Sequence, residues 1–339
     1  MSKIQNTFLI SKMQDRLEKL DNIRKMGIEP YGSKFISSHN IEQIISDFKE
    51  KERVKISGRI MALRGHGKAA FLDIQDSSCR MQAYVKRDNV SEQDFLLFKN
   101  LDIGDIIGLE GVLFITHKGE KTIAVEKLFL LSKSLKPLPE KWHGLKDVEI
   151  RYRRRCLDLM VNTETRKTFL IRTEIIKQIR RFLDERDFKE VETPMLQGLA
   201  GGAKAKPFVT HYNALNYDVY LRIAPELFLK RLLVGGLEKI YELNRNFRNE
   251  GISAVHNPEF TMLEIYQAYA DYTDMMHLTE ELILNLAKII LNEEKAKWKD
   301  KDISLSLPWQ RITFYESLKR ETKIDFQDRN LDIRKAATE

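Results

Sequence analysis

The spacing of hydrophobic residues changes along the chain, first from the period of a helix to that of a strand. In residues 8–27 hydrophobic positions recur every three or four residues, which predicts an amphipathic helix. Gly27 stands where a helix C-cap belongs, and Pro30 prevents the helix from resuming. The predicted buried stripe contains Leu9, Met13, Leu17, Leu20 and Ile23, and the predicted outer face carries Lys12, Arg16, Lys19, Arg24 and Lys25.

From Arg53 to about Leu131 the period becomes two, which is the period of a strand with one buried face. Five short strands are predicted in some 80 residues, with a helical insert near 91–100. This pattern is typical of a small Greek-key barrel such as the OB-fold. The alternating apolar positions are Val54, Ile56, Ile60, Leu72, Ile74, Met81, Ala83, Val85, Ile107, Leu109, Leu113, Ile123 and Val125.

The same alternation predicts which side chains point away from the barrel core. The outward set on the second and third strands is Phe71, Gln75, Gln82 and Tyr84. Two aromatic rings among amides and basic residues suit a platform for unstacked nucleic acid bases. Single exposed aromatic residues are common on any protein surface, but here the ring pair and the barrel pattern favour the binding interpretation.

The barrel is followed by residues 132–150, which contain two prolines and no clear period and are interpreted as a linker. The basic run Arg151–Arg155 comes next and either pairs with phosphates or forms salt bridges; the sequence does not distinguish these roles. A second domain is predicted to contain a helix over 168–188, an extended segment broken at Pro194, a glycine-containing stretch over 199–208, a strand over 219–223, a helix from Pro225 to Gly235 and a strand over 239–250.

The strand over 239–250 has one apolar and one densely polar face. Tyr241, Leu243 and Phe247 fall on the first face, and Glu242, Asn244, Asn246, Arg248 and Glu250 on the second. The segment over 260–266 repeats this arrangement, with Phe260, Met262, Glu264 and Tyr266 on one face and Leu263 and Ile265 on the other. The sequence therefore predicts a polar wall on two adjacent strands, below a loop that bears His256.

Such a wall suits a ligand that is phosphorylated, aromatic and charged. Arginine offers a planar, charged fork to phosphate oxygens, an aromatic ring stacks on a base, and carboxylates with a tyrosine hydroxyl hold an ammonium group. The sequence contains no Walker loop, no G-x-G-x-x-G and no recognisable nucleophile set. A reaction between two bound substrates, driven by positioning and charge stabilisation, is what the residues favour.

Composition adds limits to this interpretation. No apolar run reaches the roughly 20 residues that cross a bilayer, and charges interrupt the N-terminal segment, which does not read as a secretory signal. Cys79 and Cys156 lie far apart and predict neither a disulfide framework nor a zinc site, so we expect reduced thiols in the cytoplasm. The net charge of +7 is compatible with an anionic partner, and the basic outer face of the first helix is either solvated or contacts nucleic acid.

Several segments resemble the class II aminoacyl-tRNA synthetases in their lysine-specific form. RNFRNEGISAVHNPEFTMLEIYQAYADY resembles motif 2 of that family, and FKEVETPMLQ resembles motif 1, whose proline (Pro194 here) lies at the dimer interface. GKAAFLDIQD, GLEGVLFITHKGE, LPEKWHGLKDVEIRYRRRCLDL, GGAKAKPF and YLRIAPELFLKRLLVGG are similar to other stretches of the lysine enzymes. The resemblance covers essentially the whole chain, and aspartate or asparagine enzymes are not expected to contain HNPEFTMLE or RIAPEL.

The resemblance implies roles for individual residues. Arg248 is the catalytic arginine that holds the ATP α-phosphate, Phe260 stacks on adenine, Glu250 lies near the adenine amino group, and His256 with Asn257 lies over the phosphates. Glu226, Glu264 and Tyr266 belong to the lysine pocket, with the backbone of Gly202 and Ala203 near the lysine amino group. In the barrel, Arg64, Phe71, Gln82 and Glu126 read the anticodon.

The implied reaction has two steps. The carboxylate of L-lysine attacks the α-phosphate of ATP, assisted by Arg248 and Mg²⁺, and the lysyl group then passes from lysyl-adenylate to the 3′ end of tRNA(Lys). Motif 3, the Mg²⁺ ligands and one further pocket carboxylate are expected beyond residue 339, because they are absent here and the chain stops in the apparently helical LDIRKAATE. We therefore expect an incomplete fragment of a homodimeric enzyme, with no metal site of its own.

The expected fold class is α+β, with an OB-fold barrel followed by an incomplete class II antiparallel sheet and its flanking helices. The expected ranges are a helical extension over 1–50, the anticodon-binding barrel over 51–135, a linker over 136–165 and the catalytic domain over 166–339. Two alternatives remain: a non-catalytic RNA-binding module, and a ligase of the aspartate or asparagine type. Glu226 and Glu264 argue against the latter because they favour a cationic side chain.

Overall fold

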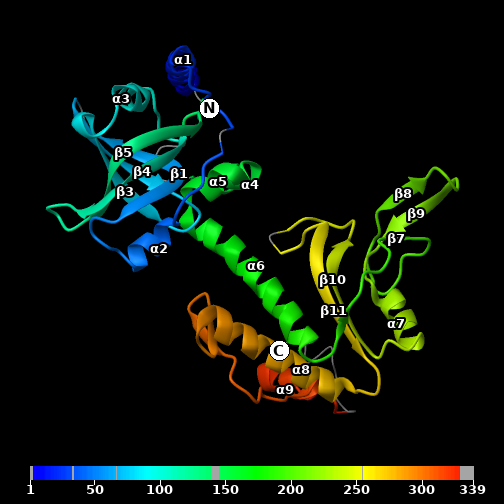
Figure 1. The fold of residues 1–339 in the computed structure, drawn as a ribbon. Helices are drawn as coiled ribbons and strands as arrows, with labels where there is room; N and C mark the ends of the chain where they lie inside the picture. Colours follow the sequence, from blue (N-terminus) through cyan, green and yellow to red (C-terminus); the bar gives the residue numbers. More distant parts are fainter. Residues whose placement is uncertain (1–2, 33, 66, 139–144, 254, 329–339) are drawn as a thin grey trace. The chain divides into compact units, whose positions relative to one another are not determined.

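A computed structural model of the chain describes residues 3–32, 34–65, 67–138, 145–253 and 255–328, with side chains from residue 11 onward. It divides into two compact units, Met1–Thr163 and Glu164–Glu339 (Figure 1). The last nine residues, which the sequence predicts to be part of a helix, lie outside the described residues. Each unit is considered by itself below.

The first unit is built around a closed five-stranded barrel, as predicted. The strands are β1 (Arg53–Arg64), β2 (Ala69–Gln75), β3 (Arg80–Lys86), β4 (Ile106–Ile115) and β5 (Lys121–Ser132), in the order β1-β2-β3-β5-β4. The expected helical insert is α3 (Glu92–Lys99), whose N-cap Ser91 accepts a hydrogen bond from the amide of Asp94. The α+β architecture with an N-terminal OB-fold barrel is therefore confirmed.

Burial in the barrel follows the predicted alternation. All thirteen apolar positions named from the period are buried and belong to one core cluster. The outward residues Phe71, Gln75, Gln82 and Tyr84 are half-buried. Phe71 lies opposite Tyr84 in the β2–β3 register, and their ring centroids are 4.8 Å apart.

The N-terminal helix α1 (Lys3–Lys25) is longer than predicted, and part of its predicted face is wrong. Leu20 and Ile23 are buried, but Leu17 is exposed, whereas Arg16, assigned to the outer face, is buried. Its guanidinium donates to the carbonyl oxygens of Ile103, Ser134 and Lys136 at 2.8–3.2 Å. Arginine can occupy an inward position because its five donors satisfy such carbonyls. The helix ends as predicted, with Gly27 at φ +70°.

A buried ionic cluster joins the end of β5 to the loop before β4. Lys133 Nζ lies 2.6 Å from Asp102 and 2.9 Å from Asp105, and the side chains of Lys133 and Asp105 are fully buried. Lys19 of α1 also contacts Asp102, at 2.6 Å. Burial opposes ionisation of Asp102, but hydrogen bonds from Lys133 and Lys19 outweigh it and lower the pKa of Asp102. The short helix α2 (Ile41–Ser46) adds its buried Ile41 and Ile44 to the barrel core.

Two short helices form within the range interpreted as a linker. They are α4 (Val148–Arg153) and α5 (Arg155–Val161). Asp158 is fully buried and pairs with Arg151 and Arg155 at 2.9 and 2.5 Å. Two arginines of the basic run are therefore used in an internal ion-pair cluster, which the sequence alone did not decide.

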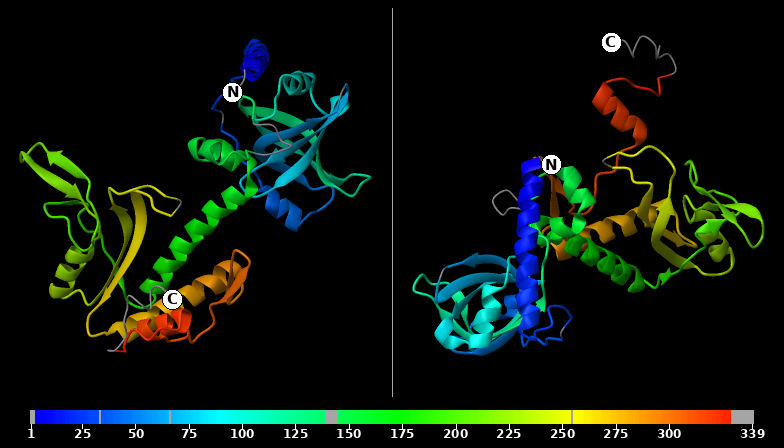
Figure 2. Two further views of the ribbon diagram at one scale, coloured as in Figure 1. Left: turned by 180° about the vertical axis from the view of Figure 1, so that it is seen from behind. Right: turned by 90° about the horizontal axis from the view of Figure 1, so that it is seen from above.

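The second unit is centred on a three-stranded sheet in the order β11-β10-β6. Strand β10 (Lys239–Phe247) is antiparallel to β11 (Glu259–Gln267) and parallel to the short β6 (Lys189–Glu190). The long helices α6 (Thr163–Asp184) and α8 (Tyr272–Leu291) cover one face through a core that contains Phe182, Leu183, Tyr241, Leu263, Ile265 and Leu282. Figures 1 and 2 show β10 and β11 between these helices and α7 (Glu226–Val234).

A second small sheet lies beside α7, in the order β7-β9-β8. Its strands are β7 (Leu196–Gln197), β8 (Val209–Tyr212) and β9 (Tyr217–Leu221), of which the sequence predicted only β9. Helix α7 follows Pro225 and ends at Gly235, as predicted. After α8 come the hairpin β12 (Lys295–Trp298) and β13 (Lys301–Ser304), and helix α9 (Phe314–Thr322).

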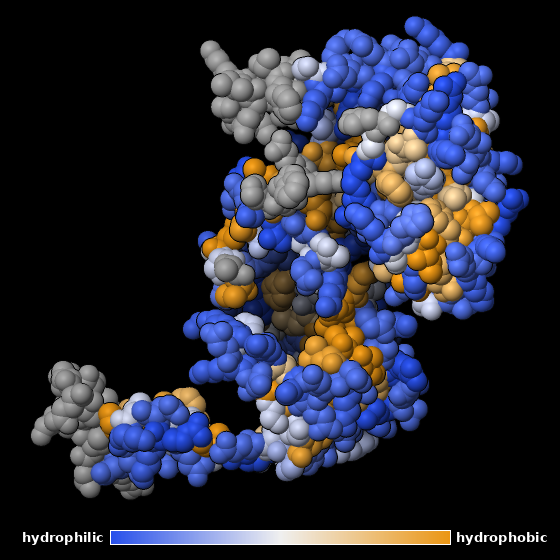
Figure 3. Space-filling model, turned by 90° about the vertical axis from the view of Figure 1, so that its left-hand side faces the viewer, coloured by the Kyte–Doolittle hydropathy of each residue, from blue (hydrophilic) through white to orange (hydrophobic). Residues whose placement is uncertain are grey.

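The surface is mainly hydrophilic on the face drawn in Figure 3, with hydrophobic residues in patches between hydrophilic ones. This agrees with the 32% of charged residues in the chain. None of the helices within the described residues is long and apolar enough to cross a membrane.

Candidate functional site

The register of β10 and β11 builds the polar wall that the sequence predicts. Glu242 lies opposite Glu264, Asn244 opposite Met262 and Asn246 opposite Phe260, while Tyr241 and Leu243 face Ile265 and Leu263 on the other side. Strand β10 ends at Phe247, three residues earlier than predicted, because the chain then turns: the amide of Arg248 donates to Pro258 O and that of Asn249 to Lys206 O. Arg248 and Glu250 therefore belong to the loop at the end of the wall.

Charge is buried in the wall at Glu242, which pairs with Arg222. The Arg222 Nη1 to Glu242 Oε1 distance is 2.6 Å, and both side chains are almost completely buried. The Thr193 hydroxyl donates to Glu242 Oε2 at 2.6 Å and accepts from Arg222 Nη1 at 3.0 Å. A buried ion pair is tolerated only with such supporting hydrogen bonds.

The end of the wall near Asn246 and Arg248 holds buried polar atoms that have no hydrogen-bond partner among the described residues. Within the described residues, Asn246 Nδ2, Asn246 Oδ1 and Arg248 Nε are buried and make no hydrogen bond. The guanidinium carbon of Arg248 lies 5.2 Å from the centre of the Phe260 ring. Buried polar groups are nearly always paired in proteins, so unpaired polar atoms beside the half-buried Phe260 ring indicate a place for a ligand.

The loop after β10 brings further predicted residues to this end. Glu250 Oε1 accepts from the amide of Lys206 at 3.2 Å, which joins the loop to the glycine-containing stretch. His256 Nδ1 lies 2.8 Å from the hydroxyl of Ser253, and His256 and Asn257 are both exposed. The exposed side chains of His256 and Asn257 are therefore accessible to a ligand.

At the other end, Gly202, Glu226, Glu264 and Tyr266 come together. Gly202 has φ +87°, and a side chain there would lie 2.9 Å from Glu226 Cβ, so glycine permits a close approach. The Tyr266 hydroxyl donates to Glu264 Oε2 at 3.0 Å. Ala203 is exposed next to Gly202.

The electrostatics of this end suit a cation. Burial raises the pKa of Glu264, and the nearby carboxylates of Glu226 and Glu242 raise it further, against the hydrogen bond from Tyr266. Burial and the charge of Glu264 likewise raise the pKa of Tyr266. Carboxylates that repel one another in a half-buried site are stabilised by a bound ammonium group.

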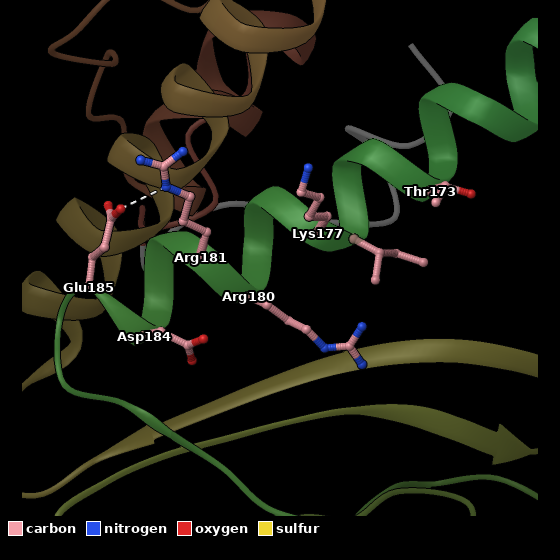
Figure 4. A pocket seen from close by; sticks show the side chains of 7 residues that line it. Thr173, Lys177, Arg180, Arg181, Asp184 and Glu185 are labelled. Carbon is pink, nitrogen blue, oxygen red and sulfur yellow. Dashed lines mark hydrogen bonds and ion pairs between the residues drawn. The ribbon is translucent and has the colours of Figure 1, made fainter. Parts of the chain in front are cut away.

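A separate hollow of about 520 Å³ lies along one side of α6 (Figure 4). Its lining residues come from this helix and from Glu185 directly after it, and none is a predicted site residue. Arg181 pairs with Glu185, Arg180 pairs with Glu190, and Asp184 accepts from the Tyr241 hydroxyl. Its main charged groups thus already pair within the protein, and the wall is the stronger candidate site.

Pro194, the predicted interface residue, is exposed near β7.

In the first unit, three of the four predicted base-reading residues lie on adjacent strands. Arg64 lies opposite Phe71, and Gln82 lies opposite Asp73, which accepts from Arg64 at 2.6 Å. Glu126 comes from β5, the other neighbour of β3, and pairs with Arg53 at 2.9 Å. The outer face of β1–β3 therefore carries a ring pair with an amide and an arginine beside it.

Sequence reasoning missed Arg222 and Thr193. Their only signal was a charged residue inside the apolar run YLRIAP and a hydroxyl before Pro194, and neither has a local partner. No group of three or more His, Cys, Asp or Glu side chains that could hold a metal ion occurs among the described residues.

Comparison with known proteins agrees with both units. Residues 147–338 match the model of tRNA synthetases class II (D, K and N), and residues 54–131 match the OB-fold nucleic acid binding domain. The lysine–tRNA ligase of Carboxydothermus hydrogenoformans is 56% identical over 92% of this chain and 64% of its own length. That of Pelotomaculum thermopropionicum is 56% identical over 93% and 62%, and that of Bacillus cytotoxicus 46% identical over 96% and 67%.

The chain spans about two thirds of the length of these curated relatives. One family model covers more than half of the chain, and the relatives match nearly all of it. The chain therefore belongs to the class II tRNA synthetases of the D, K and N group.

Proposed function

We propose that this chain is the tRNA-binding and substrate-activating part of a lysine–tRNA ligase, which activates L-lysine with ATP and transfers it to the 3′ end of tRNA(Lys). The observation that carries the proposal is the wall of β10 and β11. One end holds an arginine with an unpaired buried nitrogen beside an aromatic ring, and the other holds two carboxylates and a tyrosine.

ATP binds at the Arg248 end. There the Arg248 guanidinium and the Phe260 ring lie 5.2 Å apart. Arg248 donates to the α-phosphate, and Phe260 stacks on adenine. Glu250 accepts from the adenine amino group, and His256 and Asn257 of the exposed loop close over the phosphates. Arg248 also stabilises the negative charge that develops on the α-phosphate during attack.

L-lysine binds at the carboxylate end. Its side-chain ammonium pairs with Glu264 and the Tyr266 hydroxyl, and Glu226 with the backbone of Gly202 and Ala203 holds the α-amino group. The lysine carboxylate then faces the α-phosphate held by Arg248, and attack gives lysyl-adenylate and pyrophosphate. The wall supplies position and charge rather than a nucleophile.

The barrel recognises the anticodon of tRNA(Lys). The half-buried ring of Phe71 stacks on a base, and Arg64, Gln82 and Glu126 read base edges. We assign the anticodon-binding domain to 51–135, a helical extension to 1–50, a connecting segment to 136–165 and the activating domain to 166–339. The net charge of +7 favours the tRNA partner.

Lysine–tRNA ligases are expected to use Mg²⁺, but the described residues do not fit a magnesium site, because no three acidic or histidine side chains converge. No step above depends on the ion. We also propose that the chain acts in the cytoplasm and that Pro194 lies at a homodimer interface.

The test is L-lysine-dependent ATP–pyrophosphate exchange by the 339-residue chain, with aspartate and asparagine as controls. Exchange with lysine alone supports the proposal for this chain. Exchange with aspartate or asparagine instead assigns a different amino acid. Binding of tRNA(Lys) without any exchange limits the chain to an RNA-binding part of the enzyme.

A further inference from the structure

Arg222 occupies an unusual place between the two sheets of the second unit. Its side chain is fully buried one residue after β9, and it makes hydrogen bonds to two separate segments, β10 and residues 193–195. Nε donates to Arg245 O on β10 at 2.9 Å, and Nη1 donates to Glu242 Oε1 and to the Thr193 hydroxyl. Its backbone amide donates to Met195 O, and its carbonyl accepts from Phe247 N.

Stability alone does not account for this arrangement. A buried ion pair is generally no more stabilising than well-packed apolar side chains of the same volume. Here the pair is also incompletely satisfied, since Arg222 Nη2 is buried and has no hydrogen-bond partner among the described residues. What the guanidinium provides, and an apolar residue does not, is fixed directional contact with several groups at once.

The two predicted lysine-binding carboxylates lie next to Arg222 and to its partner Glu242. Glu226 follows four residues later, after the buried residues Ile223 and Ala224. Glu264 lies directly opposite Glu242, the carboxylate that Arg222 holds. The chain therefore connects Glu226 to Glu264 through Arg222 and Glu242.

The charge of Arg222 is a second, independent reason to connect this residue with the lysine end of the wall. Glu242 and Glu264 are direct cross-strand neighbours, and like charges in this position repel each other. The charge of Arg222 lowers the pKa of Glu264, whereas Glu226 and Glu242 raise it. Arg222 thus neutralises Glu242. Among the described residues, Glu264 accepts only from the Tyr266 hydroxyl, and Glu226 pairs with Lys230 Nζ at 2.6 Å near the helix surface.

We propose that Arg222 is a positioning residue that determines lysine specificity: it fixes the separation of Glu226 and Glu264 and withdraws the charge of Glu242 from the site. This inference rests on the proposed function and deepens it. The ATP end depends on Arg222 less, because Arg248 and Phe260 are held by the β10–β11 register and by the hydrogen bond from Arg248 N to Pro258 O.

The test compares Arg222→Lys and Thr193→Val with the unchanged 339-residue chain. Lysine keeps the charge but not the fork, and valine keeps the shape of Thr193 but loses its two hydrogen bonds. The matched control is Arg180→Lys, which changes an exposed arginine paired with Glu190 at 3.0 Å in the same unit. Hydrogen–deuterium exchange is measured for peptides that cover 222–226 and 242–247, without ligand and against rising L-lysine or ATP.

In Arg222→Lys we expect exchange at 222–226 and the L-lysine midpoint each to rise about tenfold, as for the loss of one charge-assisted hydrogen bond. The ATP midpoint changes less than about threefold, and Thr193→Val shifts in the same direction by about threefold. The control matches the unchanged chain in every readout. Because Thr193→Val leaves the ion pair in place, it decides the question if Arg222→Lys does not fold.

Unchanged exchange at 222–226 in both variants overturns the proposal. So does an equal rise of the L-lysine and ATP midpoints, which would mean that Arg222 supports the whole unit rather than the lysine end. If the unchanged chain shows no response to L-lysine, the proposed function fails for this chain. The ligand-free exchange at 222–226 still decides whether Arg222 fixes that segment.

Discussion

The barrel of the first unit and the polar wall of the second both bury charged side chains, but they do so differently. In the barrel, Lys133 contacts both Asp102 and Asp105 at 2.6–2.9 Å. In the wall, Arg222 is paired with Glu242, yet one of its nitrogens has no partner, and the same holds for Asn246 and Arg248. All four unpaired buried atoms found among the described residues lie in the second unit.

This difference distinguishes buried polar groups that stabilise the fold from buried polar groups that are available to a ligand. A buried charge that is fully paired within the protein stabilises one conformation and offers nothing to a ligand. Unpaired buried donors cost free energy in the unliganded protein, and a ligand that satisfies them recovers it. The two units can therefore be tested by the same kind of substitution with opposite outcomes.

The largest effect is expected for Lys133→Met in the barrel. The change leaves Asp105 buried without its cation, and breaking a buried pair from one side costs about 3–5 kcal/mol of unfolding free energy. Denaturant unfolding followed by circular dichroism measures it. Lys127→Met is the control, since Lys127 is mostly exposed and 3.9 Å from Glu110, and we expect no measurable change there. Equal stability of the two variants would show that the cluster is not structural.

Arg248→Ala in the wall should leave stability nearly unchanged and weaken ATP binding. The buried Arg248 Nε has no partner to lose, whereas hydrogen bonds to a charged ligand contribute about 1.5–3 kcal/mol, or roughly 10- to 100-fold in affinity. Calorimetric titration with ATP measures the effect. The exposed Arg245 of the neighbouring strand β10 provides the control, as Arg245→Ala. A destabilised variant with normal ATP affinity would remove the distinction between wall and barrel.

Phe71→Ala tests the outer face of the barrel. Loss of one stacked base costs about 1–3 kcal/mol, so affinity for the anticodon stem-loop of tRNA(Lys) should fall about tenfold. Fluorescence anisotropy with a labelled stem-loop measures it. Ile115→Ala removes an exposed apolar side chain at the end of β4 and should have no effect. A similar loss in both variants would argue against stacking at Phe71.

The smallest effect concerns pH at the lysine end. Because the pKa of Glu264 is raised in the folded protein, its carboxylate becomes protonated at a higher pH than the usual value of about 4.3. Affinity for L-lysine should therefore fall as pH decreases through that raised pKa, by at most about tenfold per pH unit. Titration at several pH values measures it. Glu264→Gln should bind weakly with no such dependence, and an unchanged pH profile in that variant would assign the proton to another group.

In the barrel, the pKa shift of Asp102 has the opposite direction to that of Glu264, so its effect on stability with pH is also opposite. The pKa of Asp102 is lowered in the folded protein, so Asp102 contributes stability above its unfolded pKa and loses it as pH falls through the folded one. Glu264, with its raised pKa, reduces the stability of the second unit as pH rises above the unfolded value. Mild acid thus favours the unliganded wall and, at lower pH, weakens the barrel.

Local periodicity was sufficient to predict much of the fold. The alternation in 53–131 determined the five strands and their buried faces, because a period of two admits only one inward set once a core exists. The two faces of β10 and β11 followed from the same rule. The end of α1 at Gly27 and of α7 at Gly235 followed from cap residues.

Tertiary structure alone decided how charges are used. Arg16 and Leu17 exchange their predicted faces because carbonyls of distant loops reach Arg16. Arg222 pairs with Glu242, twenty residues away, and with Thr193, twenty-nine residues away. The sequence determined which residues carry chemistry and on which face of a strand they lie, since these depend on neighbours along the chain. Which charges are paired and which remain for a ligand depends on residues that only folding brings together.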